Sequence, residues 1–298
     1  MSAPHAEISV ASAPVRAAPA RPAGPRVRRI AAAAGWWLAS VALFGGLWEL
    51  AWAMGWAPEL LLPPPHVFLQ SFATQASFFD TSTIGEAQAP PPVAVATTVL
   101  ATVGRVLTGL AIGFVASLVT GVVVSQLALV GKLILPTVTL LAPISPIAWL
   151  PVSIFLFGIG NGPAVFMVFI GVFFVMTLAT ISEINGVSAT YLNVARTMGA
   201  TRRQTLFQVI LPAILPGLLQ TLRMNLFAAW MVVLLAEAVG VGSGLGQVVM
   251  LARNTFNSSL VFFTMTVIGI SGYLLDIVFR QVQGRLLWWR PAGAGAAR

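Results

Sequence analysis

The chain has 298 residues, of which 58% are hydrophobic and only 8% charged, and its mean hydropathy is +0.91. Because soluble domains carry about 25% charged residues, this composition excludes an ordinary soluble protein and predicts an integral membrane protein with several spans. Sixteen Lys and Arg outnumber eight Asp and Glu, and the absence of cysteine excludes disulfides and thiolate metal sites.

The N-terminal residues 1–30 are rich in Ala, Pro and Arg and lack an apolar core, so we expect a disordered basic tail in the cytoplasm. The first predicted span, 33–56, has tryptophans near both ends, as is typical of membrane interfaces. Its apolar run continues without a clear cleavage site. This favours a retained anchor over a removable signal peptide.

The segment 57–93 contains acidic residues but no Lys or Arg, so the positive-inside rule predicts that it is external. The second predicted span, 94–129, contains a charge only at Arg105 and carries repeated glycines. Small residues at three-to-four spacing let helix backbones approach closely in lipid, so we expect this helix to be buried among others.

The next fifty residues, 133–182, contain no charge and are long enough for two spans. We place these spans at 133–157 and 163–183, joined by the turn "GIGNGP". Four prolines fall in the first of the two. They require neighbouring helices or a cavity to satisfy the freed carbonyls. Ser145 and Pro146 of "SPIAW" are therefore candidates for lining a pathway, and a simple bend in a packed helix is the alternative.

The stretch 188–212 contains three arginines, a glycine in the middle and a closing proline. The sequence predicts a short helix over 191–198 that ends at Gly199 in a left-handed cap. Thr201 followed by Gln204 is a capping box, which predicts a second helix that breaks near Pro212. The simplest interpretation is a solvated basic loop on the cytoplasmic side. That interpretation does not explain why the loop would contain two capped helices.

The last two predicted spans are 217–239 and 260–280, followed by a C-terminal tail at 291–298. Six spans place both termini on the same side, and the basic residues cluster at both ends. The sequence therefore predicts an all-α, polytopic membrane protein of about six helices, with residues 31–290 as its membrane domain and both termini in the cytoplasm.

Several kinds of chemistry have no candidate residues. The single lysine, Lys132, is not in a G-x-x-x-x-G-K-[ST] phosphate-binding loop, so the chain is not predicted to hydrolyse ATP. His5 and His66 lie far apart, and no serine has a base near it in the sequence. We therefore expect no catalytic residue, no metal and no cofactor bound by this chain.

Five charged residues fall within or near the predicted spans: Glu49, Arg105, Arg223, Glu237 and Asp276. Such charges are costly unless they are paired or hydrated. Arg223 and Asp276 lie near cytoplasmic ends, where we expect them to extend toward water. Arg105 and Glu237 both lie toward external ends. Two interpretations remain open for them: a helix-locking ion pair, or a pathway in which Arg105 attracts an anion.

The stretch 188–212 resembles the cytoplasmic coupling loop of permease subunits of bacterial ABC importers, whose pattern is E-A-A, three residues, Gly, nine residues and I-x-L-P. The matching positions are Asn193, Val194, Ala195, Gly199, Val209, Leu211 and Pro212. The spacing agrees throughout, and the main departure is Asn193 in place of the usual glutamate. The resemblance extends over about residues 36–290. "SPIAWLPVS", "YLNVAR" and "FNSSL" are similar to the nitrate and bicarbonate-type permeases more than to the sulfonate and taurine type.

This resemblance implies a homodimeric importer permease in the bacterial inner membrane. Each copy would contact a cytoplasmic ATPase that binds ATP and Mg²⁺, and an external binding protein would deliver a small anion. From their positions on the helix, Arg202 and Arg203 are candidates for polar contacts with the ATPase, and Leu206 and Phe207 are candidates for apolar contacts. Loss of the glutamate at Asn193 affects any salt bridge to the ATPase but not the shape of the loop.

Three other classes of protein are the alternatives. A structural membrane anchor would need neither the glycine-rich external loop nor the capped cytoplasmic element. A secondary transporter or channel for small solutes would need no docking loop, and often has broken spans in both halves of the chain. A DNA-binding helix-turn-helix over 191–210 conflicts with the membrane spans on either side, so we expect no nucleic-acid partner.

Overall fold

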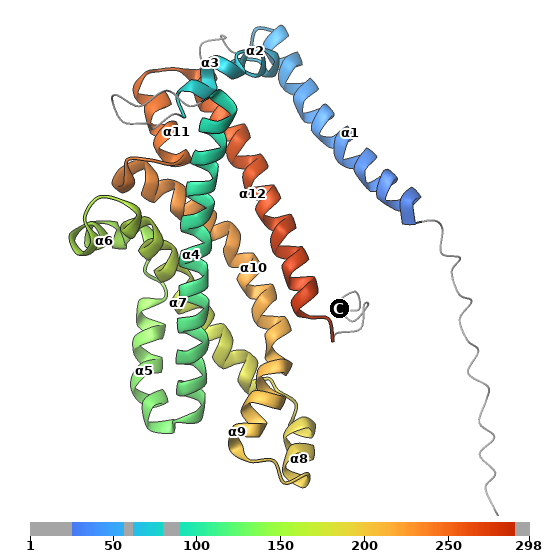
Figure 1. The fold of residues 1–298 in the computed structure, drawn as a ribbon, viewed down its shortest axis with the longest axis vertical. Coiled ribbons are helices and arrows are strands. Elements are labelled where there is room, and N and C mark those ends of the chain that lie inside the picture. Colours follow the sequence, from blue (N-terminus) through green and yellow to red (C-terminus); the bar gives the residue numbers. More distant parts are fainter. Residues whose placement is uncertain (1–25, 57–61, 80–89, 290–298) are drawn as a thin grey trace, which may run out of the picture.

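The computed structural model describes residues 26–56, 62–79 and 90–289, and every regular element within these ranges is a helix (Figure 1). The prediction of an all-α polytopic fold is confirmed. Four helices in the described ranges are long and apolar enough to cross a membrane, and a bent pair makes a fifth if it counts as one span. The sequence predicted about six. The predicted first span is not among the four, and the predicted third span is the bent pair.

Helix α1, Arg26–Ala53, begins earlier than the predicted first span and includes residues 26–30 of the expected tail. Residues 1–25 and 290–298, where the rest of the two expected tails falls, lie outside the described residues. The helix stands apart from the bundle along most of its length (Figure 1). Its contacts with other helices include Trp37 stacked on Tyr273, with ring centroids 5.8 Å apart, and the ion pair of Glu49 with His66 at 3.0 Å. Two short helices follow, α2 (Pro65–Gln70) and α3 (Phe72–Ser77).

Helices α4 (Pro91–Gln126) and α7 (Asn161–Asn185) run parallel and in close contact. A Cβ atom at Gly109 or Gly121 of α4 would lie 2.6 Å from the Cβ of Val168 or Thr180 of α7. In both pairs the glycine and its β-branched neighbour are separated by the same number of residues, so the same contact recurs along the two parallel helices. The expectation that the glycines allow close helix packing is confirmed at these positions.

The span expected over 133–157 is instead two helical pieces that meet at an angle of 99°. Helix α5, Ala128–Leu141, is followed by the 3₁₀ turn η1, Pro146–Trp149, and by α6, Leu150–Phe157. Pro143 and Pro146 explain the break, because neither can donate to the helix ladder and because Ser145, which precedes Pro146, is extended with a ψ of 135°.

The element after the short helices α8 (Ala189–Thr197) and α9 (Arg202–Gln204) is continuous with a membrane span. It consists of a π-helical segment, η2 (Thr205–Ile210), helix α10 (Leu211–Ala236) and a second π-helical segment, η3 (Glu237–Val241). Together with α9 these segments form one apolar run of 40 residues, Arg202–Val241. Helix α11 (Leu245–Asn254) and the last span, α12 (Ser258–Leu286), complete the described fold.

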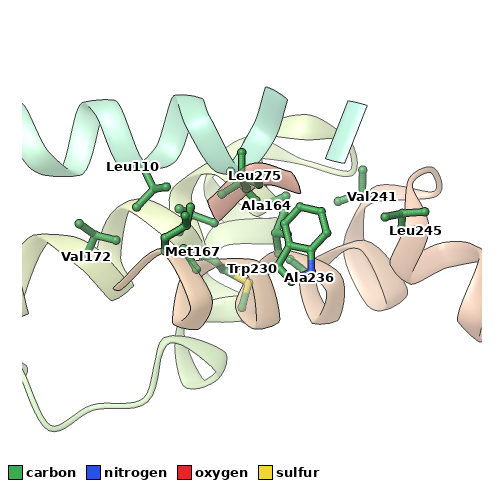
Figure 2. Close-up of a cluster of buried hydrophobic side chains, with 14 of the residues drawn as sticks. Leu110, Ala164, Met167, Val172, Trp230, Ala236, Val241, Leu245 and Leu275 are labelled. Carbon is green, nitrogen blue, oxygen red and sulfur yellow. The ribbon is translucent and has the colours of Figure 1, made fainter. Parts of the chain in front are cut away.

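The main core lies where α4, α7, α10, α11 and α12 meet. Figure 2 shows Leu110 of α4, Met167 of α7 and Trp230 of α10 directed into this cluster. A smaller cluster packs α5 against α7 around Val138, Ile170 and Phe174. The core holds α10 firmly, and α10 connects the two ends of the molecule where the candidate sites lie.

Candidate functional site

The stretch 188–212 forms a compact element, α8 and α9, at one end of the bundle (Figure 1). Helix α8 ends as predicted, with Gly199 at a φ of +75°. The Gly199 amide donates to the Arg196 carbonyl at 3.0 Å, and the Ala200 amide donates to the Ala195 carbonyl at 3.0 Å. This is the Schellman arrangement, which satisfies the last carbonyls of a helix and needs a left-handed residue at its centre.

The second helix begins with the predicted capping box. The Gln204 amide donates to Thr201 Oγ1 at 3.3 Å, and the Thr201 amide donates to Gln204 Oε1 at 2.8 Å. The predicted break at Pro212 is wrong, because the helix passes through this residue into α10. The π-helical segment η2 lies directly before Pro212 and shifts the hydrogen-bond register there, so that a residue without an N–H is accommodated.

An exposed apolar row runs along α8. Tyr191, Val194 and Met198 follow one another at helical spacing and are 60%, 53% and 80% exposed. Among the residues named from the sequence, Asn193 is exposed beside this row and Ala195 is buried against the body of the protein. The pattern of the motif identified Val194. It did not identify Tyr191 or Met198, although their spacing was visible in the sequence.

The residues of α9 and η2 divide into two groups. Arg202, Arg203 and Phe207 are exposed, and the guanidinium of Arg203 lies 5.9 Å from the centre of the Phe207 ring. Leu206 is half-buried and packs against the main core, so this side chain stabilises the loop rather than projecting from it. Leu211 and Pro212 are half-buried and line an apolar pocket of about 260 Å³ together with Phe207 and Trp289.

The electrostatics of this end are positive, because no acidic residue occurs between Glu183 and Glu237. Arg196, Arg202 and Arg203 are all exposed there. The element thus combines a fixed backbone, an exposed apolar row and three arginines that form no ion pair among the residues the structure describes. Such a surface is suited to docking against a folded partner. In water the side chains of the apolar row stay exposed, whereas a partner would bury them.

A second site lies at the opposite end, where Arg105 of α4 forms a buried ion pair with Glu237 of η3. The guanidinium also donates to Asn161 Oδ1 at 2.8 Å and to Ser243 Oγ at 2.7 Å. The Glu237 carboxylate accepts hydrogen bonds from Thr102 Oγ1 at 2.8 Å and from the Gly246 amide at 3.0 Å. The cluster therefore connects α4, α7, η3 and α11 through one network.

The glycine-rich loop "VGVGSGLG" crosses directly over this ion pair. A Cβ atom at Gly244 would lie 2.3 Å from the Glu237 carboxylate, and one at Gly246 would lie 1.9 Å from the Leu234 carbonyl oxygen. Gly244 also has a φ of +105°. Only glycine allows the backbone to approach so closely that amides of the loop hydrogen-bond the buried polar groups.

Of the two interpretations of Arg105, the structure favours the helix-locking pair. Its side chain is only 7% exposed and the Glu237 side chain is fully buried, so the charges cancel within the cluster. The guanidinium charge is therefore already compensated by a neighbouring carboxylate. Thr102, Asn161 and Ser243 were missed from the sequence, because each is an ordinary polar residue until the fold brings it to the pair.

Arg223 of α10 and Asp276 of α12 differ from the prediction. Arg223 and Asp276 do not extend separately toward water. Arg223 Nε lies 2.8 Å from Asp276 Oδ1, and Arg280 Nη2 lies 3.0 Å from Asp276 Oδ2. Pairing two arginines with one buried carboxylate satisfies the charges within the protein and ties α10 to α12.

The residues proposed to line a pathway lie at the bend between α5 and η1. Ser145 is exposed and starts η1, and Pro146 borders a small cavity of about 40 Å³ beside Asn225. A cavity of this size holds a water molecule or two rather than a solute. The pathway role of Ser145 and Pro146 stays a prediction.

Comparison with known proteins gives a consistent picture. Residues 109–287 match the family described as "Binding-protein-dependent transport system inner membrane component". A putative ABC transporter permease of Methanocaldococcus jannaschii is 34% identical over 187 residues, which is 62% of this chain and 70% of that protein. The taurine transport system permease of Escherichia coli is 28% identical over 233 residues, 77% of this chain and 80% of that one.

Other relatives and solved structures agree. A nitrate import permease of Synechococcus elongatus is 28% identical over 184 residues, covering 59% of this chain and 66% of that protein. An inward-facing methionine ABC transporter, MetNI, superposes with a TM-score of 0.58 at 20% identity, over 67% of this chain and 99% of the matched one. Together with the capped loop at the motif positions, these matches show that the chain belongs to the family of binding-protein-dependent transport inner membrane components, the permeases of ABC importers.

Proposed function

We propose that this chain forms the membrane pathway of an ATP-driven importer and that α8 and α9 transmit the motion of a cytoplasmic ATPase. The observation that carries the proposal is the exposed apolar row on α8, Tyr191, Val194 and Met198, held in place by the Gly199 cap and surrounded by positive charge. Family membership favours this function over a secondary transporter or channel.

The continuity of η2 with α10 supports the coupling role. Because the chain does not break at Pro212, a force applied to α9 passes along one run of 40 residues to Glu237 at the far end. Transport requires that the two ends of the permease change their arrangement together. A continuous helical segment from the docking element to the opposite end meets this requirement more directly than a flexible loop would.

The assembly that we propose is a homodimer of this chain with two ATPase subunits, which bind ATP and Mg²⁺, and an external binding protein. It places the chain in the bacterial inner membrane with both termini in the cytoplasm. Asn193, exposed beside the apolar row, offers no carboxylate to the ATPase. Docking of α8 therefore depends on apolar contacts and on the arginines Arg202 and Arg203.

The proposed substrate is a small oxyanion of the nitrate, nitrite, cyanate or bicarbonate type, and a sulfonate such as taurine is the second candidate. The names of the relatives cover both groups, with nitrate and taurine permeases at similar identity. The motifs "SPIAWLPVS" and "FNSSL" favour the first group. Uptake of each labelled anion into proteoliposomes, with the binding protein present, decides between the two groups.

The coupling role is tested by Met198→Asp with Ala189→Asp as its matched control. Ala189 is the first residue of α8 and Met198 is the residue that caps its end. Both are exposed, and because they lie nine positions apart they project on opposite sides of the helix. We expect Met198→Asp to abolish retention of the ATPase during gentle purification and ATP-driven uptake, whereas Ala189→Asp keeps both. Equal behaviour of the two variants, with an ATPase retained, contradicts docking through this row.

A further inference from the structure

The turn between α11 and α12 has an unusual backbone. Among the non-glycine residues that the structure describes, Phe256 alone has a positive φ, at +51°. Its side chain is 87% exposed. An aromatic residue in the left-handed region is sterically unfavourable, and here the ring gains almost no contact within its own chain.

The turn repeats the cap found at the end of α8. The Phe256 amide donates to the Arg253 carbonyl at 3.2 Å, and the Asn257 amide donates to the Ala252 carbonyl at 3.0 Å. Phe256 thus occupies the same position in its cap as Gly199 occupies in the other. Glycine fits this position without strain, so the local fold does not explain the phenylalanine.

The turn is also rigid. Asn257 Oδ1 accepts a hydrogen bond from the Leu260 amide at 3.0 Å and so caps α12. Asn257 Nδ2 donates to Gln75 Oε1 of α3 at 3.4 Å. The Phe256 ring is therefore exposed on a backbone that hydrogen bonds hold in place, from the cap of α11 on one side and from Asn257 on the other. A pre-organised aromatic side chain is the kind that contributes most to a protein interface, because little freedom is lost on binding.

The position of this turn indicates its partner. It lies at the end of the bundle opposite to α8 and α9 (Figure 1). The inference rests on the proposed function, which makes that end external and supplies a binding protein as the partner there. The three residues before Phe256 are polar and exposed: Arg253, Asn254 and Thr255. A polar, positively charged turn matches a protein surface better than the interior of a lipid leaflet.

We propose that Phe256 is the anchor residue for the external binding protein, inserting its ring into an apolar pocket of that protein. Arg253 is exposed three residues before Phe256 and faces an acidic group at the rim of the pocket. The unfavourable backbone of Phe256 is retained because the ring is needed outside this chain. The interface therefore combines one apolar contact at its centre with one charged contact at its edge.

The test uses the reconstituted importer in nanodiscs and its own binding protein, identified as the soluble protein that raises ATP hydrolysis by the complex. We expect Phe256→Ala and Phe256→Gly each to weaken binding by about tenfold or more. Phe256→Gly relieves the backbone, so its melting temperature stays equal to or above that of the unchanged protein. Leu69→Ala, an exposed apolar residue of α2 at the same end, is the control and leaves binding unchanged.

Three results would overturn the inference. The first is unchanged binding in both Phe256 variants, and the second is a lower melting temperature for Phe256→Gly, which would give the ring a structural role. The third result comes from Phe256→Cys, a variant with a single cysteine that can carry a spin label. The inference fails if this label lies in lipid both with and without the binding protein. Failure of the proposed function is distinct, since the unchanged complex would then show no stimulated ATP hydrolysis at all.

Discussion

Substitution of one member of the buried ion pair between Arg105 and Glu237 is the sharpest test of how the helices are held together at the end opposite α8 and α9. In Glu237→Gln the shape of the side chain and an acceptor for the Thr102 and Gly246 donors are retained, but the negative charge is lost. Arg105 then remains charged at 7% exposure, bonded only to Asn161 and Ser243. The variant therefore tests mainly the effect of an uncompensated buried charge, and its amide group adds a donor where the second carboxylate oxygen accepted a hydrogen bond.

The expected loss follows from the burial of the pair. Removing one partner of a buried ion pair costs roughly 3–5 kcal/mol in the free energy of unfolding. At about 2–4 °C per kcal/mol for a domain of this size, the melting temperature falls by about 6–20 °C. The double variant, Arg105→Gln with Glu237→Gln, carries no buried charge. We expect it to recover at least half of the loss of the single variant.

The assay is thermal unfolding followed by tryptophan fluorescence, for which the chain provides nine tryptophans. Arg253→Gln serves as the control, because this arginine is exposed and forms no ion pair among the described residues. Its melting temperature should change by about 1–2 °C at most, as for other surface substitutions. The reasoning is refuted if the losses of the two single variants simply add in the double variant, because the side chains would then stabilise the fold independently.

Three further substitutions test the remaining geometry. Gly246→Ala places a methyl group 1.9 Å from the Leu234 carbonyl oxygen, so we expect almost no folded protein by size-exclusion chromatography; a normal yield contradicts the loop packing. Gly199→Ala forces an alanine to a φ of +75° and should cost about 1–2 kcal/mol in thermal unfolding, and an unchanged melting temperature would show that the cap can rearrange. Asp276→Asn leaves the partly exposed Arg223 without its carboxylate, and we expect a smaller loss than for Glu237→Gln, about 1–3 kcal/mol; the reverse order would mean that burial does not set the cost.

Much of the candidate site could be predicted from the sequence because it depends on neighbouring residues. The cap at Gly199 and the box between Thr201 and Gln204 involve partners no more than five positions apart. Local hydrogen bonds of this kind are encoded by residue type and spacing alone. The motif spacing likewise indicated which residues form the docking element. It could not show that Leu206 packs inward whereas Met198 projects outward.

The break in the expected span 133–157 shows a limit of reading hydropathy. Composition correctly identified a long uncharged segment but gave no information on its path. The prolines are visible in the sequence, yet a proline can bend a helix, end it or be accommodated within it. Pro143 lies at a break between two helices, whereas Pro212 lies within a continuous one. Which outcome occurs depends on whether the neighbouring backbone can re-form its hydrogen bonds, and that is a property of the surrounding helices.

By itself the sequence determined the membrane class, the helical fold and the two capped helices of the docking element, because each depends on composition or on local hydrogen bonds. Only the tertiary structure decided which charges meet. Arg105 and Glu237 are 132 residues apart, and Arg223 and Asp276 are 53 apart. A buried charge requires a partner, but the partner is whichever residue the packing of the helices brings within reach, and no local pattern encodes that contact.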